Sequence, residues 1–166
     1  MVKSFICNLL LITTFAGCSY SVFTNAYPHL KKIRVMAYEN QTAEFELGDI
    51  LLNRMVLQFR DDGRLRLVTQ QPDCQIEGKI AAFEEKIYSF DAANNVQDYQ
   101  IRITFGILFT DLIRNEVMYE NASLTLSEVY AVSELSTSRF KSREAAINEI
   151  IRNLFNSVMQ NTLEKW

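Results

Sequence analysis

The sequence is poor in the residues that most enzyme and metal sites require, with one histidine, five glycines and two prolines among 166 residues. So few glycines leave no Gly-rich loop that could cradle a phosphate group. His29 lies beside Pro28, with no cysteine or carboxylate cluster at metal-ligand spacing, and is interpreted as part of a solvated linker. Glu84 and Glu85 would point to opposite faces of a strand, which excludes an acid/base pair. We therefore expect no catalytic residues, no metal site and no cofactor, and predict that the chain is not an enzyme.

Runs of basic residues are absent too, and the formal net charge is −3. A mildly acidic chain of this kind is not expected to bind nucleic acid. Two groups of cations are nevertheless candidates for contacts with phosphates of an acidic lipid, although a solvated face is the simpler interpretation. They are Lys31, Lys32 and Arg34 in one group and Arg60, Arg64 and Arg66 in the other.

The first seventeen residues have the layout of a secretory signal peptide. Lys3 supplies the positive charge, Phe5–Phe15 forms the apolar core, and the small residues Ala16 and Gly17 precede Cys18. As a helix the apolar core would reach about 16 Å, whereas a membrane span needs roughly 30 Å. The ending Ala-Gly-Cys resembles the bacterial lipobox, which implies cleavage before Cys18 and attachment of acyl chains to it. An ordinary signal peptide cut elsewhere is the alternative.

This interpretation divides the chain into a signal peptide (1–17), a lipidated N-terminus and tether (18–30) and a single domain (31–166). It also leaves Cys74 as the one cysteine of the domain, because Cys7 would be removed and Cys18 would carry lipid. A lone thiol cannot form an intramolecular disulfide, so a disulfide scaffold is excluded. Cys74 is expected to be buried and inert.

The first part of the domain alternates between strand and helix patterns. Residues Ile33–Tyr38 are interpreted as a short strand, Glu44–Arg60 as a helix, and Arg64–Thr69 as a second strand. Gly63 suits the left-handed cap at the end of the helix. A strand, a helix and a strand within this length predict a parallel βαβ unit. The apolar residues of the helix recur at near four-residue spacing: Leu47, Leu51, Met55 and Phe59.

The middle of the chain predicts long antiparallel strands. Asp73–Ile80 and Tyr99–Thr110 alternate between apolar and polar residues, which indicates strands with one buried face. The polar cluster Asp91–Asn95 between them predicts a hairpin turn. Leu112–Glu116 is expected to turn the chain again, and Val117–Ser127 to return as another strand.

The end of the chain carries the strongest helical pattern. Val129–Ser138 is rich in hydroxyls and is predicted to be a loop, and Ser142 is suited to cap the helix that follows. The expected buried face is Ile147, Ile150, Ile151, Leu154, Phe155, Val158 and Thr162, and the expected exposed face is Arg143, Glu149, Arg152, Asn156 and Gln160. The predicted fold is α+β, a two-layer sandwich in which two long helices pack on a mixed, mostly antiparallel sheet of about four strands.

Three segments of the domain, taken with Cys18, resemble the lipopolysaccharide-assembly lipoprotein family, LptE. They are Ile33–Thr42 (IRVMAYENQT), Phe59–Val68 (FRDDGRLRLV) and Asp73–Ser89 (DCQIEGKIAAFEEKIYS). The corresponding family patterns are Ile-x-Val-x-x-Phe-x-Asn-x-Thr, Phe-x-x-Asp-x-Arg-Leu-x-Leu-Val and Ala-Asp-x-x-Leu-x-Gly-x-Ile. Tyr38 stands where Phe is common in the family, and the resemblance extends from Cys18 to about residue 113.

The resemblance implies a lipid-anchored protein on the periplasmic face of the outer membrane. Members of the LptE family act as a plug and scaffold for the β-barrel LptD and help to deliver lipopolysaccharide to the cell surface. Ser19 after the lipid-bearing cysteine resembles the signal for sorting to the outer membrane. The resemblance identifies no residues that contact lipopolysaccharide. The alternative is an envelope lipoprotein of the curli-secretion or penicillin-binding-protein-activator type, which shares the opening pattern. A third hypothesis is an enzyme that acts on envelope lipids, but the sequence offers no set of catalytic residues for it.

Overall fold

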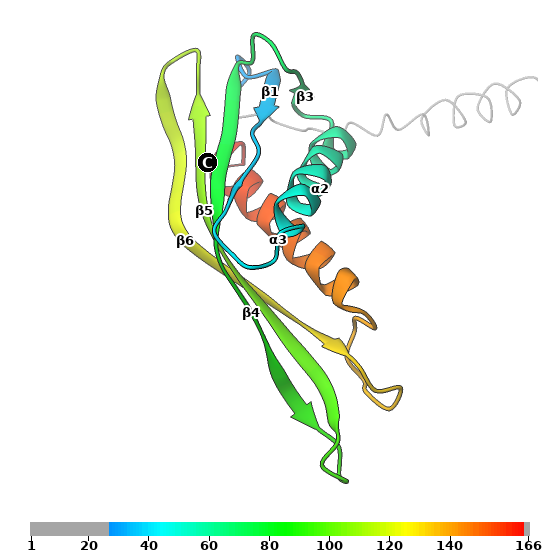
Figure 1. Cartoon of the computed structure of the whole chain (residues 1–166). Coiled ribbons are helices and arrows are strands. Elements are labelled where there is room, and N and C mark those ends of the chain that lie inside the picture. The colour runs from blue at the N-terminus through cyan, green and yellow to red at the C-terminus, as the bar shows by residue number, and fades with distance from the viewer. Residues whose placement is uncertain (1–26, 165–166) are drawn as a thin grey trace, which may run out of the picture.

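The computed structural model describes residues 27–164, so the predicted signal peptide and Cys18 lie outside the described residues. The elements, in chain order, are β1 (Lys32–Val35), β2 (Glu39–Asn40), α2 (Leu47–Asp62), β3 (Arg66–Leu67), β4 (Cys74–Phe90), β5 (Val96–Asp111), β6 (Glu116–Ala131) and α3 (Arg143–Thr162). Both helices lie on one face of a single sheet (Figure 1). This arrangement confirms the predicted α+β class.

The sheet has six strands, so the predicted number of about four is wrong. Its order is β3-β1-β4-β5-β6, and β2 pairs with β4 along the same edge as β1. The three pairings that involve β1, β2 or β3 are parallel, and the two long pairings, β4 with β5 and β5 with β6, are antiparallel. A strand of two residues, such as β2, is too short to produce the alternation by which a strand is recognised in a sequence.

The predicted parallel βαβ unit is present as β1, α2 and β3. The two strands are direct neighbours, with Lys32 opposite Arg66 and Ile33 opposite Leu67. Helix α2 ends at Gly63, whose φ of 72° is the left-handed conformation that glycine adopts without steric cost. The four apolar residues that predicted the helix are all buried: Leu47, Leu51, Met55 and Phe59.

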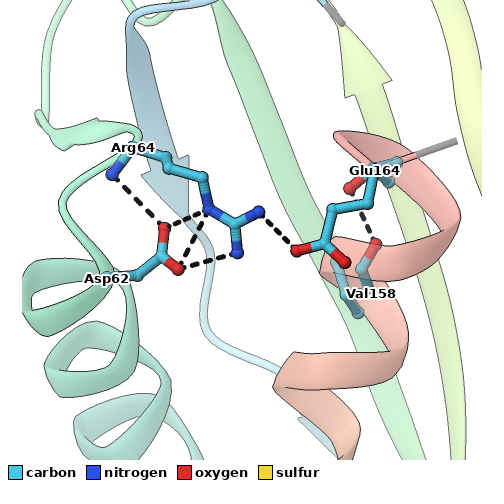
Figure 2. A network of polar contacts seen from close by, with 5 residues as sticks. Asp62, Arg64, Val158 and Glu164 are labelled. Atoms are coloured by element: carbon cyan, nitrogen blue, oxygen red, sulfur yellow. Dashed lines mark hydrogen bonds and ion pairs between the residues drawn. The ribbon is translucent and has the colours of Figure 1, made fainter. Parts of the chain in front are cut away.

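Arg64, directly after this cap, joins the ends of the two helices (Figure 2). Its guanidinium donates hydrogen bonds to both carboxylate oxygens of Asp62, with Nε 2.8 Å from Oδ1 and Nη2 2.7 Å from Oδ2. Nη1 lies 2.5 Å from Oε1 of Glu164, which follows α3. These hydrogen bonds raise the pKa of Arg64, the bond to Asp62 contributing most. Arg64 therefore has a structural role, and its guanidinium is not the free lipid contact that the sequence suggested as a candidate.

The long hairpin of β4 and β5 forms as predicted. The carboxylate of Asp91 closes the turn by accepting hydrogen bonds from the backbone N–H groups of Ala93 and Asn95, both at 2.8 Å. Strand β6 is longer than expected, because Tyr130 and Ala131 continue to pair with β5. The predicted loop at 129–138 therefore begins only after Ala131.

Helix α3 covers the middle of the sheet with its predicted apolar face. The hydroxyl of Ser142 accepts a hydrogen bond from the backbone N–H of Ala145 at 3.1 Å, which confirms the predicted N-cap. Glu149 departs from the prediction, since it is buried rather than exposed. Its carboxylate is neutralised by Arg152 at 2.5 Å and by Arg139 at 3.5 Å, and paired charges of this kind tolerate burial.

A close approach at Gly78 fixes the core between the first strands and the hairpin. A Cβ atom at this position would lie 2.1 Å from the carbonyl oxygen of Gly106 and 2.9 Å from the ring of Tyr38. The missing side chain therefore makes room for Tyr38, which is buried in the core. Burial raises the pKa of Tyr38 above its usual value.

Candidate interaction site

The three long strands of the sheet, β4, β5 and β6, are much longer than the helices that cover them. The seventeen residues of β4 span roughly 55 Å at about 3.3 Å per residue. The twenty residues of α3 span about 30 Å at 1.5 Å per residue. The turn between β4 and β5 consequently extends past both helices (Figure 1). Part of the sheet is left without a covering layer.

Large apolar side chains are exposed on this projecting part. We call this group the distal surface: Ile87, Tyr88, Phe90, Val132 and Leu135, with exposed fractions between 44% and 76%. A single exposed apolar residue needs no explanation, but a group at one end of the molecule is typical of an interaction site. The sequence does carry a signal for this surface, because Ile87 and Tyr88 are adjacent and so place apolar groups on both faces of a strand.

A buried carboxylate holds the two segments of the distal surface together. Asp98 of β5 is 6% exposed and accepts hydrogen bonds from the hydroxyls of Ser89 and Ser136. Burial alone would raise the pKa of Asp98, but the hydrogen bonds from Ser136, Ser89 and Ser138 and the charge of Lys141 together outweigh it, so the pKa is lowered. Ser89 belongs to β4 and Ser136 to the loop after β6, while Val132 donates to the carbonyl of Gln97 at 3.1 Å. The distal surface is therefore an ordered part of the fold.

A second network fixes the hairpin against the helical layer. The hydroxyl of Tyr130 donates to Glu85, and Arg143 at the start of α3 contacts Glu85 at 3.1 Å and Glu44 at 2.9 Å. Burial and the neighbouring carboxylate of Glu85 raise the pKa of Tyr130 to about 12. Glu84, by contrast, faces Arg102 at 4.0 Å. The adjacent glutamates thus have separate structural partners.

No set of metal-binding side chains is found among residues 27–164. The helices in this range are also too short or too polar to cross a lipid bilayer. Cys74 is buried as predicted, and burial raises the pKa of its thiol to about 12, with Asp73 and Asp111 adding to the effect. The prediction that His29 lies in a solvated linker is wrong, because its Nε2 lies 2.6 Å from the buried carboxylate of Asp111. The adjacent Leu30 is also in the core, at 1% exposed.

Most of the predicted cations have partners within the domain. Lys32 contacts Asp73 at 3.3 Å, Arg34 donates to the side-chain oxygen of Gln75, and Arg60 lies 3.3 Å from Asp61. Lys31 and Arg66 are exposed and have no ion pair among the described residues. The structure brings these two together with Lys32 around one hollow at the end of the sheet.

A family model for lipopolysaccharide assembly, LptE, matches residues 30–162 of the chain. The chain belongs to this family. The match spans nearly all of the described domain, and it supports an assignment to the lipoproteins of lipopolysaccharide assembly. No curated protein matches the chain.

The residues that carry the LptE pattern have structural tasks here. The side-chain oxygen of Asn40 accepts hydrogen bonds from the backbone and hydroxyl of Thr42, and its amide donates to the carbonyl of Glu44. These bonds shape the turn that leads into α2. The carboxylate of Asp73 accepts hydrogen bonds from the backbone N–H groups of Lys31 and Lys32, both at 2.9 Å. The pattern therefore identifies the fold. Of the distal surface, Ile87 and Tyr88 lie within the matching segment Asp73–Ser89, and Phe90, Val132 and Leu135 lie outside the three segments.

Solved structures show the same fold at low sequence identity. Protein XCC0632 from Xanthomonas campestris has a TM-score of 0.55 at 14% identity, with 84% of this chain and 87% of that chain covered. The hypothetical protein CT253 from Chlamydia trachomatis has a TM-score of 0.51 at 9% identity, covering 78% and 94%. The uncharacterized lipoprotein B from Nitrosomonas europaea has a TM-score of 0.50 at 11% identity, covering 79% and 81%. At these identities the likeness concerns the fold alone.

Proposed function

We propose that this LptE-family protein is a non-catalytic plug and scaffold subunit of a lipopolysaccharide translocon, working with an outer-membrane β-barrel of the LptD type. The observation that carries the proposal is the family match over residues 30–162, which includes every helix and strand described. In this proposal acyl chains on Cys18 anchor the chain at the periplasmic face of the outer membrane. The residues between Cys18 and Tyr27 serve as the tether, since His29 and Leu30 belong to the folded domain. The domain that follows performs the function by binding rather than by catalysis.

We propose the distal surface as the part that contacts the barrel. Its exposed apolar side chains would be desolvated on binding, at roughly 25 cal/mol for each Å² of apolar surface removed from water. The networks around Asp98 and Glu85 hold this surface in place before binding, so little conformational entropy is lost when the partner docks. An ordered apolar surface of this kind fits a stable partner better than a transient one.

Co-purification with the barrel tests this proposal. A distal variant that combines Ile87→Ser, Tyr88→Ser and Phe90→Ser should recover far less barrel than the unchanged protein, and less lipopolysaccharide should reach the cell surface. A control variant combining Met36→Ser and Phe45→Ser removes exposed apolar side chains elsewhere and should behave as the unchanged protein. Normal surface lipopolysaccharide after depletion of the protein, together with a stable barrel-free form, would refute the role in the translocon.

The anchor is tested separately. Metabolic labelling with palmitate should mark the unchanged protein and leave a Cys18→Ser variant unlabelled, with the variant released from the membrane fraction. Labelling of both proteins, or of neither, would refute acylation at Cys18 without bearing on the barrel contact.

A further inference from the structure

Strand β6 forms one border of the sheet (Figure 1), since β5 is the strand with which it pairs. The end of β6 shows which way its backbone groups point. The N–H of Val132 donates to the carbonyl of Gln97 in β5 at 3.1 Å, whereas the N–H of Ala131 donates to the carbonyl of Phe140 on the other side, at 2.9 Å. Ala131 therefore directs its backbone away from β5, and the chain itself supplies a neighbour there.

The same direction recurs at every second residue of β6, because the backbone groups of an antiparallel strand alternate. The register with β5 is unbroken from Ala131 back to Leu124, so Thr125 and Ser127 also turn their N–H and C=O groups outward. Side chains approach most closely at residue pairs that share no backbone hydrogen bond, and the hydroxyl of Thr125 indeed lies 3.0 Å from that of Thr104 in β5. Within residues 27–164, no backbone partner is found for the outward groups of Thr125 and Ser127.

These groups belong to a stretch of β6 that the fold leaves uncovered. We call the segment Leu124–Val129 the open edge, because a register shift after Phe105 interrupts the pairing before it and Phe140 covers the residues after it. Sheet edges that avoid strand addition are blunted by charged side chains, proline or bulges. The one charged residue of the open edge is Glu128, and Asn153 of α3 donates to its carboxylate at 3.2 Å. This charge is thus turned toward the helical layer and does not guard the edge.

The side chains of the open edge specify the kind of strand that fits beside it. Leu124 and Leu126 pack against the core but are only partly buried, so an added strand would cover more of their apolar surface. Thr125 and Ser127 are exposed on the opposite face of the sheet. Because residues directly across a strand pair share a face, the matching partner is an extended segment in which apolar and small polar residues alternate.

We propose that the open edge accepts such an extended segment of the β-barrel, which adds to the sheet as a further strand. The inference rests on the proposed function, which supplies the barrel as the partner. Continuity with the distal surface favours the barrel as the occupant, since β6 leads directly into Val132. Ser127 precedes Val132 by five residues, or about 17 Å along the strand. A barrel segment in contact with the distal surface can therefore continue along the open edge, where backbone hydrogen bonds add to the side-chain contacts of the tip.

Proline substitution separates the backbone contact from side-chain contacts. Thr125→Pro and Ser127→Pro each remove an outward N–H and leave the hydrogen bonds to β5 in place, and proline is tolerated at such edge positions. Each variant should bind the purified barrel about ten-fold more weakly, because one backbone hydrogen bond is lost and the ring obstructs pairing. The control is Gln70→Pro, at an exposed position just after β3 on the other border of the sheet, and it should bind as the unchanged protein does. Thermal unfolding confirms that each variant is folded, and undiminished binding by both folded edge variants would overturn the proposal.

Hydrogen exchange gives a second test that needs no substitution. The amides of Thr125 and Ser127 should exchange fast in the free mature protein and at least about 100-fold more slowly in its complex with the barrel. The amides of Leu126 and Glu128, which point toward β5, serve as references that stay slow in both states. Protection in the barrel-free protein would overturn the proposal, whether a second copy or the residues before Tyr27 supplied the strand.

The same measurements distinguish failure of the open edge from failure of the proposed function. If the unchanged protein retains barrel while the amides of Thr125 and Ser127 stay unprotected, the open-edge contact is refuted and the proposed function stands. If the unchanged protein retains no barrel at all, the proposed function is refuted and the open-edge contact with it.

Discussion

Replacing Arg64 by methionine tests whether this residue holds the ends of α2 and α3 together. Methionine keeps most of the apolar stem but removes every hydrogen bond to Asp62 and Glu164. The Arg64 and Asp62 side chains are each 15% exposed, so the carboxylate of Asp62 would lose its partner in a largely desolvated position. A hydrogen bond to a charged group contributes about 1.5–3 kcal/mol, whereas the contact with the half-exposed Glu164 should add less than about 1 kcal/mol.

We therefore expect Arg64→Met to lower the free energy of unfolding by about 2–3 kcal/mol, which corresponds to a fall in Tm of roughly 10 °C for a domain of this size. The matched control is Arg60→Met, since Arg60 is 64% exposed and, among residues 27–164, forms an ion pair only with its neighbour Asp61. That change should cost less than about 0.5 kcal/mol. Urea denaturation followed by circular dichroism measures both. Equal destabilisation by the two variants would refute the structural role of Arg64, as would a value for Arg64→Met within the error of the control.

Three further predictions concern the core and the hairpin. Gly78→Ala should lower the free energy of unfolding by more than about 3 kcal/mol or prevent folding, because the new Cβ would lie 2.1 Å from a backbone oxygen. In the control, Gly48→Ala, the new Cβ has its nearest neighbour at 3.6 Å and should stabilise α2 by up to about 1 kcal/mol. Equal stabilities of the two variants would contradict the steric argument. Since the folded-state pKa of Asp98 is lowered, its contribution to stability is present above the unfolded-state pKa and is lost as the pH falls through the folded-state value. Tm should therefore drop below about pH 4, and less steeply in Asp98→Asn; parallel pH profiles would show that Asp98 is not responsible. Cys74, with its pKa raised to about 12, should resist a thiol reagent at pH 8 until the protein unfolds, and fast labelling of the native protein would refute its burial.

The sequence predicts the parts of this fold in which one repeat of burial runs over many residues. The buried face of α3 and the alternation along β5 are both long enough to be recognised without tertiary information. Strand β2 was not predicted as a strand of its own, because it has only two residues and forms through pairing with the distant β4. Strand β3 was predicted, but it is shorter than the expected strand Arg64–Thr69. Strand β6 was predicted too short for a related reason: its last residues pair with β5 and with Phe140, and their own sequence has little alternation.

Two polar residues were misplaced because burial depends on partners that are distant in the sequence. His29 is held by Asp111, 82 residues away, and nothing near Pro28 in the sequence indicates that contact. Glu149 is buried because Arg139 and Arg152 neutralise it. The same limit applies to the candidate site, since the distal surface combines residues of β4 with residues after β6, and only the pairing around Asp98 brings them together.

The free edges of the sheet constrain how the distal surface meets a partner. Beyond Ile80, no described strand pairs with the outer side of β4, so its backbone groups there are open to another strand. Natural edges that avoid strand addition carry charged side chains, and Glu84 and Lys86 are both exposed on this segment. Strand addition along the middle of β4 is therefore disfavoured, whereas the tip beyond Lys86 carries apolar side chains. The contact with the barrel should accordingly depend on the side chains of the tip, so that Tyr88→Ser weakens it more than changes along the charged segment.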